Sequence, residues 1–195
     1  MKIRYNAPAV LTFAFLSAII LVLSQTVARS LTEQWFVVPG RQDFSVSNLR
    51  NWVTLITHVL GHAGWHHLFS NFTFILLIGP ILEETYGSFL ILVMICITAL
   101  VTGALNVLFF SSNLLGASGV VFMMILLASF TNFNRGEIPL TFILVLVLYL
   151  GKELLDSFGS ASGSGAGISQ FAHIVGGFIG SLFGFFSRGI SARRA

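Results

Sequence analysis

The stretch GASGVVFMMILLASFT, residues 116–131, constrains the fold of this chain more than any other. It places Ser118 between small residues and then continues as an apolar run, which predicts a helix with a serine at its head. The stretch FAHIVGGFIGSLFGFF, residues 171–186, holds His173 in similarly apolar sequence. Polar side chains are energetically costly inside a membrane and are therefore usually functional. A serine and a histidine in such surroundings predict a nucleophile and its general base, and hence hydrolysis within a bilayer.

The composition is that of an integral membrane protein. Of the 195 residues, 55% are hydrophobic and 9% are charged, and the mean hydropathy is +0.91. A bilayer core about 30 Å thick requires roughly 20 apolar residues per helix. The sequence contains six such stretches with short connectors, at residues 9–27, 66–83, 89–110, 117–131, 138–155 and 170–187. The predicted fold is an all-α bundle of six membrane helices in one domain, residues 1–195, whose short fourth helix begins partway down the membrane.

The basic residues predict the orientation. The first apolar stretch is too long for a signal peptide and lacks a clear cleavage site, so we interpret it as a retained anchor. With a cytoplasmic N-terminus, six basic residues lie inside, namely Lys2, Arg4, Arg135, Arg188, Arg193 and Arg194, and four lie outside, namely Arg29, Arg41, Arg50 and Lys152. This modest positive-inside bias explains the net charge of +3 without a nucleic-acid partner. The single cysteine, Cys96, excludes an intramolecular disulfide.

Two connectors differ from the apolar stretches. Residues 29–65 mix polar residues with Trp35, Trp52 and other apolar side chains, which predicts a loop half embedded at the membrane interface. Residues 159–167 are rich in serine and glycine. They are expected to form a flexible segment that lets the preceding helix move, or else a plain surface turn.

A cluster of histidines precedes the second apolar stretch. His67 and Asn71 are four residues apart, so in a helix they share a face and can present donors to one point. Acyl transfer passes through an oxyanion that preorganised N–H groups stabilise, and these two side chains with the backbone amide of Ser118 are candidate donors. The alternative is that they only pack at the interface.

The same cluster could also be interpreted as a metal-binding site. His58, His62 and His66 repeat at intervals of four, a spacing by which a helix can offer imidazoles to zinc. However, the segment lacks a His-Glu-x-x-His motif, and Gly61 and Gly64 interrupt a continuous helix. We therefore expect neither a catalytic metal nor another cofactor.

Taken together, the motifs resemble those of the rhomboid intramembrane serine proteases. Four family patterns occur in family order over about residues 52–187: His-x-x-x-Asn at His67 and Asn71, Gly-x-x-x-Glu-x-x-x-Gly at Gly79, Glu83 and Gly87, Gly-x-Ser-Gly at Gly116, Ser118 and Gly119, and Ala-His-x-x-Gly-x-x-x-Gly at Ala172, His173, Gly176 and Gly180. A single Gly-x-Ser-Gly would be weak evidence, but the set is specific. Two features depart from the pattern: Phe122 stands where many rhomboids have a tyrosine, and the first long connector lacks the Trp-Arg pair of some relatives.

The resemblance implies a Ser118–His173 dyad, since no carboxylate lies near the expected site. Gly116 and Gly119 would allow close approach of substrate, and the small residues Gly176, Gly180 and Gly184 would let the His173 helix pack on the Ser118 helix. Phe122, one helical turn after Ser118, would stack on the His173 ring. The resemblance gives Glu83 a structural role, and a carboxylate at a helix end more often caps or bridges neighbouring groups than catalyses.

The sequence therefore predicts an enzyme of a bacterial inner membrane that cleaves transmembrane segments of other proteins. The resemblance implies that substrates reach the site laterally, between the second and fifth helices. The alternative is a catalytically silent rhomboid-like protein that binds or chaperones membrane clients. A transporter is disfavoured, because the sequence shows neither inverted repeats nor a path of intramembrane charges. Oligomeric state does not follow from the sequence.

Overall fold

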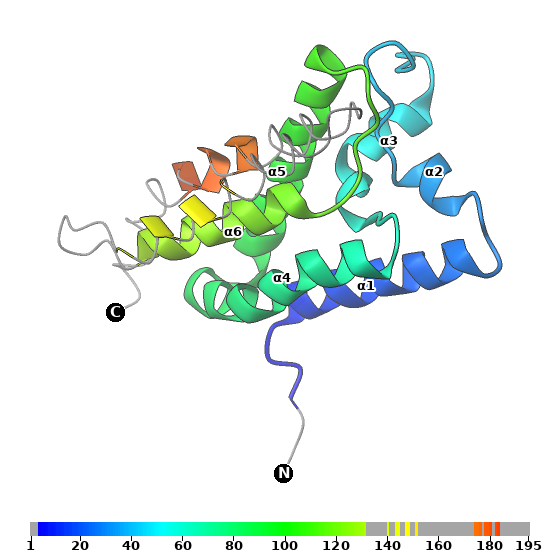
Figure 1. Ribbon diagram of the computed structural model, residues 1–195. Coiled ribbons are helices and arrows are strands. Elements are labelled where there is room, and N and C mark those ends of the chain that lie inside the picture. The colour runs from blue at the N-terminus through cyan, green and yellow to red at the C-terminus, as the bar shows by residue number, and fades with distance from the viewer. Residues whose placement is uncertain are drawn as a thin grey trace.

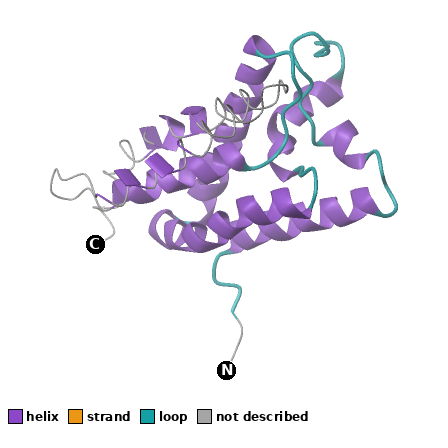
Figure 2. Cartoon of the chain, viewed as in Figure 1, coloured by secondary structure: helices purple, strands orange, loops and turns teal. Residues whose placement is uncertain are grey.

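The computed structural model describes residues 4–131 and, further along the chain, residues 140, 143, 144, 147, 148, 151, 174–176, 178–180, 182 and 183. This described part is helical, with loops between the helices and no β-strand (Figure 2). Three helices are long and apolar enough to cross a membrane: α1 (Pro8–Gln25), α4 (Trp65–Tyr86) and α5 (Ser88–Phe109). A fourth apolar helix, α6 (Ser118–Thr131), is shorter.

These four helices begin and end within three residues of the spans expected at 9–27, 66–83, 89–110 and 117–131. The expected spans at 138–155 and 170–187 fall mostly outside the described residues, as does the segment 159–167. Those of their residues that are described are helical.

Helix α6 lies in the middle of the described molecule. In Figure 1 it runs between α4 and the described residues of the range 174–183, which are drawn in orange. Every residue from Val120 to Leu127 is at most 6% exposed. A helix that is apolar on all sides lies in a protein core or against lipid, and here α4 and α5 both pack against it. Ser118, the first residue of α6, therefore stands at the end of a buried helix.

Helices α1 and α4 lie side by side and are joined by a buried carboxylate (Figure 1). Pro8, the first residue of α1, has no N–H, so the unpaired donors of its first turn begin with the next two amides. Glu83 of α4 accepts both of them, from Ala9 at 2.8 Å and from Val10 at 2.9 Å. A helix N-terminus favours an anion, so the buried side chain of Glu83 caps α1.

The two glycines around Glu83 complete this junction. A methyl group on Gly79 would lie 2.7 Å from Cγ2 of Val10, so a glycine there lets α1 and α4 approach closely. Gly87 has φ +87° and forms the one-residue turn between α4 and α5. The Gly-x-x-x-Glu-x-x-x-Gly motif thus fixes how α1, α4 and α5 meet.

We expect Glu83→Ala to destabilise the protein by about 2–4 kcal/mol, because it leaves two buried N–H groups without acceptors. Glu83→Gln keeps one oxygen acceptor. Its stability should therefore lie between that of the wild type and that of Glu83→Ala. The apparent unfolding temperature in mild detergent measures the effect. Glu84→Ala is the matched control, because Glu84 is its exposed neighbour. Equal unfolding temperatures for Glu83→Ala and Glu84→Ala would contradict the capping role.

The connector 29–65 is more ordered than the expected half-embedded loop. It contains α2 (Leu31–Trp35), α3 (Leu49–Thr57) and the short 3₁₀ helix η1 (His58–Leu60). Asn48 caps α3 by accepting the N–H of Arg50 at 3.1 Å, and α3 packs on α5 where Gly103 leaves room for the backbone of Leu55. The guanidinium of Arg50 lies 5.2 Å from the ring centroid of Trp35. The connector therefore does contain a contact between a tryptophan and an arginine. The sequence does not show it as a pair, because the two residues are not neighbours in the chain.

Candidate active site

The loop that leads to Ser118 is clamped by the connector 29–65. Val38 and Leu114 exchange two backbone hydrogen bonds, each 2.9 Å long. Beside them, the Arg41 N–H donates to the Phe110 carbonyl at 2.7 Å, and the Gly40 N–H donates to Oδ1 of Asn113 at 3.2 Å. These contacts hold residues 110–114 in one conformation before the chain turns into α6.

Gly116 stands at a position of the loop that requires a glycine. Its φ is +109°, a conformation that side chains of L-residues disfavour, and its N–H donates to the carbonyl of His58 at 2.9 Å. A methyl group on Gly116 would lie 2.7 Å from both Cε1 and Nε2 of His67. The imidazole of His67 therefore lies directly against Gly116, which precedes Ser118 by two residues.

Hydrogen bonding indicates which nitrogen of His67 carries the proton. The Ala63 N–H donates to Nδ1 at 3.4 Å, which assigns the proton of the neutral ring to Nε2, the atom that faces Gly116. Asn71, one turn further along α4, is buried, and its Nδ2 donates to the backbone carbonyl of His67 at 3.0 Å. The structure thus places the His67 ring beside the loop, whereas the amide nitrogen of Asn71 is bonded within its own helix.

His58 and His62 lie behind this loop and are more deeply buried than the sequence indicated. The Nε2 of His58 donates to the Ala99 carbonyl of α5 at 3.1 Å, and the ring of His62 meets the ring of His67 edge to face at 5.0 Å. Burial lowers the pKa of His58 to about 4, although the bond to Ala99 opposes the shift. Burial and, to a lesser extent, His67 lower the pKa of His62 to about 4. Both rings are therefore neutral at pH 7.

The two lowered pKa values predict a loss of stability in mild acid. Above pH 6.5 neither the folded nor the unfolded state binds a proton at these histidines. Between pH 6.5 and about 4 only the unfolded state does, so stability falls as the pH falls. From pH 7 to pH 5 each histidine lowers the free energy of unfolding by about 2 kcal/mol, and the apparent unfolding temperature falls with it. His62→Phe should roughly halve this pH dependence, and an unchanged dependence in that variant would contradict the assignment.

The described residues between 174 and 183 pack directly on α6 at two glycines. A methyl group on Gly176 would clash with the carbonyl of Gly119, and one on Gly180 would clash with the carbonyl of Met123. Two helices can approach this closely only where one of them has glycine at the points of contact. Gly176 thus contacts the residue that follows Ser118. His173 and Gly184 lie outside the described residues.

Phe122 is only 2% exposed, so it is a core residue of α6 and not a lipid-facing one. The side chain of Glu83, from α4, binds the N-terminus of α1 and takes part in the junction between these two helices. The histidines at 58, 62 and 66 do not form one helical array, because η1 ends at Leu60 and α4 begins at Trp65. Within the described ranges, no three His, Cys, Asp or Glu side chains are grouped so that they could hold a metal ion.

The sequence did not reveal the clamp on the loop. Val38, Gly40 and Arg41 carry no motif, and Asn113 precedes the glycine-serine pattern without belonging to it. A weak signal for one neighbour of His58 was present: Thr102 is a polar residue in the apolar α5, and its Oγ1 lies 3.4 Å from Nε2 of His58.

The apolar helices are those of an integral membrane protein, and the imidazole of His67 and the backbone carbonyl of His58 both lie against the loop at Gly116. Comparison with known proteins gives the family. The Rhomboid domain family matches residues 49–189, most of the chain. The chain therefore belongs to the rhomboid family. It is similar to "Rhomboid-like protein 11, chloroplastic" of Arabidopsis thaliana, with 23% identity over 162 residues. That alignment covers 77% of this chain, which spans 58% of the length of the plant protein.

Proposed function

We propose that this protein is an intramembrane serine endopeptidase that cleaves transmembrane segments of other membrane proteins, with Ser118 as nucleophile and His173 as general base. The observation that carries the proposal is the contact between Gly176 and Gly119. Gly176 follows His173 by three residues, and Gly119 follows Ser118 by one. The two sequence motifs that bear the candidate dyad therefore come together at one point of α6.

The proposed reaction is acyl transfer. His173 takes the proton of the Ser118 hydroxyl as the oxygen attacks the scissile carbonyl, and then returns it to the leaving amine. Water hydrolyses the acyl enzyme in a second step of the same kind. The Nε2–H of His67, the amide of Asn71 and the backbone N–H of Ser118 are the proposed oxyanion donors. For Asn71 this role uses the second N–H of Nδ2, because the first donates to the His67 carbonyl.

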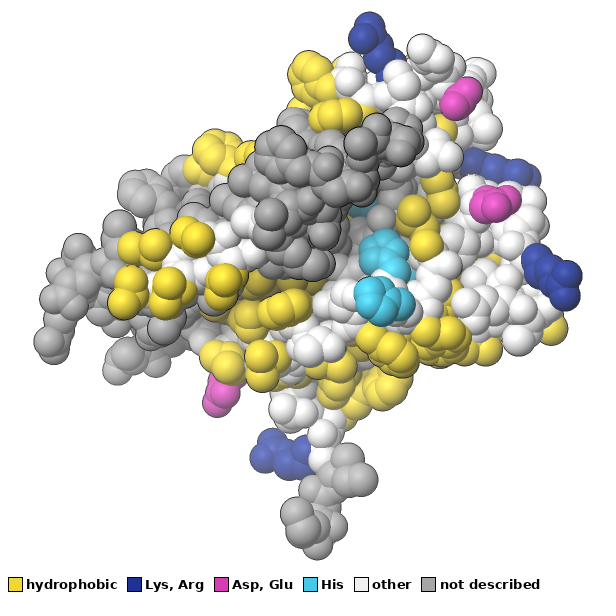
Figure 3. All heavy atoms as spheres, in the orientation of Figure 1, with side chains coloured by type: hydrophobic (Ala, Val, Ile, Leu, Met, Phe, Trp, Pro, Cys, Tyr) yellow, Lys and Arg dark blue, Asp and Glu magenta, His cyan; other side chains and the backbone are white. Residues whose placement is uncertain are grey.

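The fold proposed around this site has six membrane helices, of which α1, α4, α5 and α6 are the first four. In the proposed orientation the N- and C-termini are cytoplasmic, and the connector with α2 and α3 lies at the outer surface. Charged side chains lie toward the margins of the face drawn in Figure 3, and hydrophobic side chains form groups at its left and along its lower part, as expected for contact with lipid. The proposed location is a bacterial inner membrane, and substrates would reach Ser118 laterally between α4 and the fifth helix.

Cleavage in a purified system tests the proposal. The protein is reconstituted into vesicles with a single-span substrate whose membrane segment contains small and helix-breaking residues, since such a segment exposes its backbone most readily. The expected result is a cut within the membrane segment or at its border, without added metal. A catalytically silent rhomboid-like protein would instead retain the substrate intact in a pull-down. That outcome would refute the protease and favour a binding role.

A further inference from the structure

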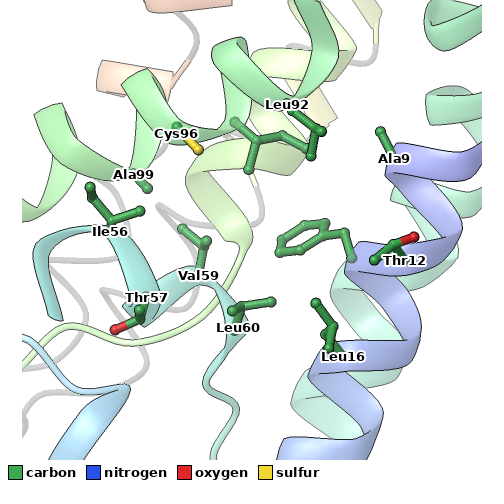
Figure 4. A pocket seen from close by; sticks show the side chains of 12 residues that line it. Ala9, Thr12, Leu16, Ile56, Thr57, Val59, Leu60, Leu92, Cys96 and Ala99 are labelled. Atoms are coloured by element: carbon green, nitrogen blue, oxygen red, sulfur yellow. The ribbon is translucent and has the colours of Figure 1, made fainter. Parts of the chain in front are cut away.

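A cavity of about 180 Å³ lies where α1, η1 and α5 meet, away from the loop at Gly116. Its wall includes Phe13 and Leu16 of α1, Val59 and Leu60 of η1, and Leu92 and Cys96 of α5 (Figure 4). Ile56 of α3 and Ala99 of α5 lie on its left side in Figure 4. We call this space the α1–α5 groove.

Apart from the weakly polar thiol of Cys96, the described wall of the groove offers no hydrogen-bonding side chain to an occupant. The two hydroxyls in its wall, those of Thr12 and Thr57, point away from its centre (Figure 4). The Thr12 hydroxyl pairs with the Tyr5 hydroxyl at 2.9 Å. The Thr57 hydroxyl donates to the carbonyl of Trp35 and lies 3.2 Å from that of Val53. A peptide or a headgroup would lose its hydrogen bonds here without replacement, so the fitting occupant is a hydrocarbon.

The size of the groove and its opening narrow the choice further. A cavity of about 150 Å³ holds one benzene ring, so this one holds about six or seven carbons. A transmembrane helix, which is about 10 Å across, is far too large. The rim residues Leu16, Ile56 and Leu92 are 45%, 42% and 44% exposed, and α1 and α5 are membrane spans. The groove is therefore continuous with the surface that faces lipid.

We propose that the α1–α5 groove is a lipid site that takes part of one acyl chain of a membrane phospholipid. The chain packs against Val59 and Leu60 of η1. His58, in the same 3₁₀ turn, accepts the N–H of Gly116. If the proposed protease function holds, the lipid therefore supports the turn that fixes the loop before Ser118.

Photo-crosslinking tests for the lipid directly and without measuring proteolysis, so the site and the protease function can fail separately. The full chain is reconstituted into phosphatidylcholine vesicles with a small fraction of phosphatidylcholine that carries a diazirine in one acyl chain. After irradiation, mass spectrometry maps the adducts. We expect adducts on groove residues of η1 and α5 to be enriched over those on exposed positions such as Leu108 and Phe109.

Three substitutions on α5 give the contrast. Cys96→Trp fills the groove and should reduce groove adducts at least about fivefold, because a packed ring leaves no room for a chain. Cys96→Ala keeps the groove open and should behave as the wild type does. Leu100→Trp adds the same ring at an exposed position one turn away, outside the groove, and should also retain the groove adducts.

If Cys96→Trp lowers the unfolding temperature, Ile56→Trp fills the groove from the opposite rim and replaces it. Groove adducts that persist in a folded, groove-filled variant would overturn the site. So would wild-type adducts spread evenly over all lipid-facing positions, because that pattern indicates only the surrounding bilayer.

Discussion

Replacing Ser118 with alanine is expected to lower the rate of substrate cleavage by at least about four orders of magnitude, because the variant has no nucleophile and retains only binding and oxyanion stabilisation. The protein should remain folded, since Ser118 is half-buried at the first residue of α6 and the substitution removes one oxygen. His173→Ala should cause a loss of similar size. The two effects should not add in the double variant, because the pair acts as a unit.

Two controls separate chemistry from packing. Ser129→Ala makes the same change at the other end of α6 and removes only a hydrogen bond of 3.0 Å to the carbonyl of Ile125. His66→Ala removes an exposed histidine from α4. Both variants should cleave at near wild-type rate. Substantial turnover by Ser118→Ala, or an equal loss in Ser129→Ala, would refute Ser118 as the nucleophile.

The second large effect is expected at Gly176, where a methyl group would meet the backbone carbonyl of Gly119. A backbone atom of a buried helix cannot rotate away, so Gly176→Ala must push the segment 174–183 off α6. Such overpacking costs about 1–3 kcal/mol. A displacement of about 1 Å between catalytic groups can reduce the rate about 100-fold. We therefore expect Gly176→Ala to lose both stability and most of its activity.

Gly180→Ala and Gly151→Ala complete the comparison. At Gly180 the clash is with the carbonyl of Met123, further from Ser118, so stability should fall more than activity. At Gly151 an added methyl group meets no atom within 4 Å, so that helical position should accept alanine without loss. Cleavage rates and unfolding temperatures, measured together for the three variants, separate a loss of activity from a loss of stability. Gly176→Ala with wild-type activity would show that this contact does not position the dyad.

Periodicity and hydropathy predicted the first four apolar helices, because a helix that must cross or fill a bilayer core carries its signal locally. Gly176 and Gly180 could also be predicted as packing residues, since a small residue at every fourth position has few other uses in an apolar helix. In the same way, Gly61 and Gly64 marked where the histidine cluster could not form one helix, and η1 and α4 are separate.

The connector 29–65 could not be predicted in the same way. Its order comes from contacts between distant parts of the chain, such as Val38 with Leu114 and His58 with Gly116. No local pattern encodes which partner such a backbone group will find. Glu83 is a similar case: its motif marked it as structural, but the two amides it caps belong to a helix more than 70 residues earlier.

The central claim is that Ser118 is an activated nucleophile that depends on His173, and covalent labelling tests it most directly. The purified protein in mild detergent is treated with a fluorophosphonate probe, and the labelled peptide is identified by mass spectrometry. We predict one adduct, on Ser118, that is absent from Ser118→Ala and nearly absent from His173→Ala, while Ser129→Ala labels as the wild type does. Failure of the folded wild-type protein to label, or labelling of Ser118 that does not require His173, would contradict the account.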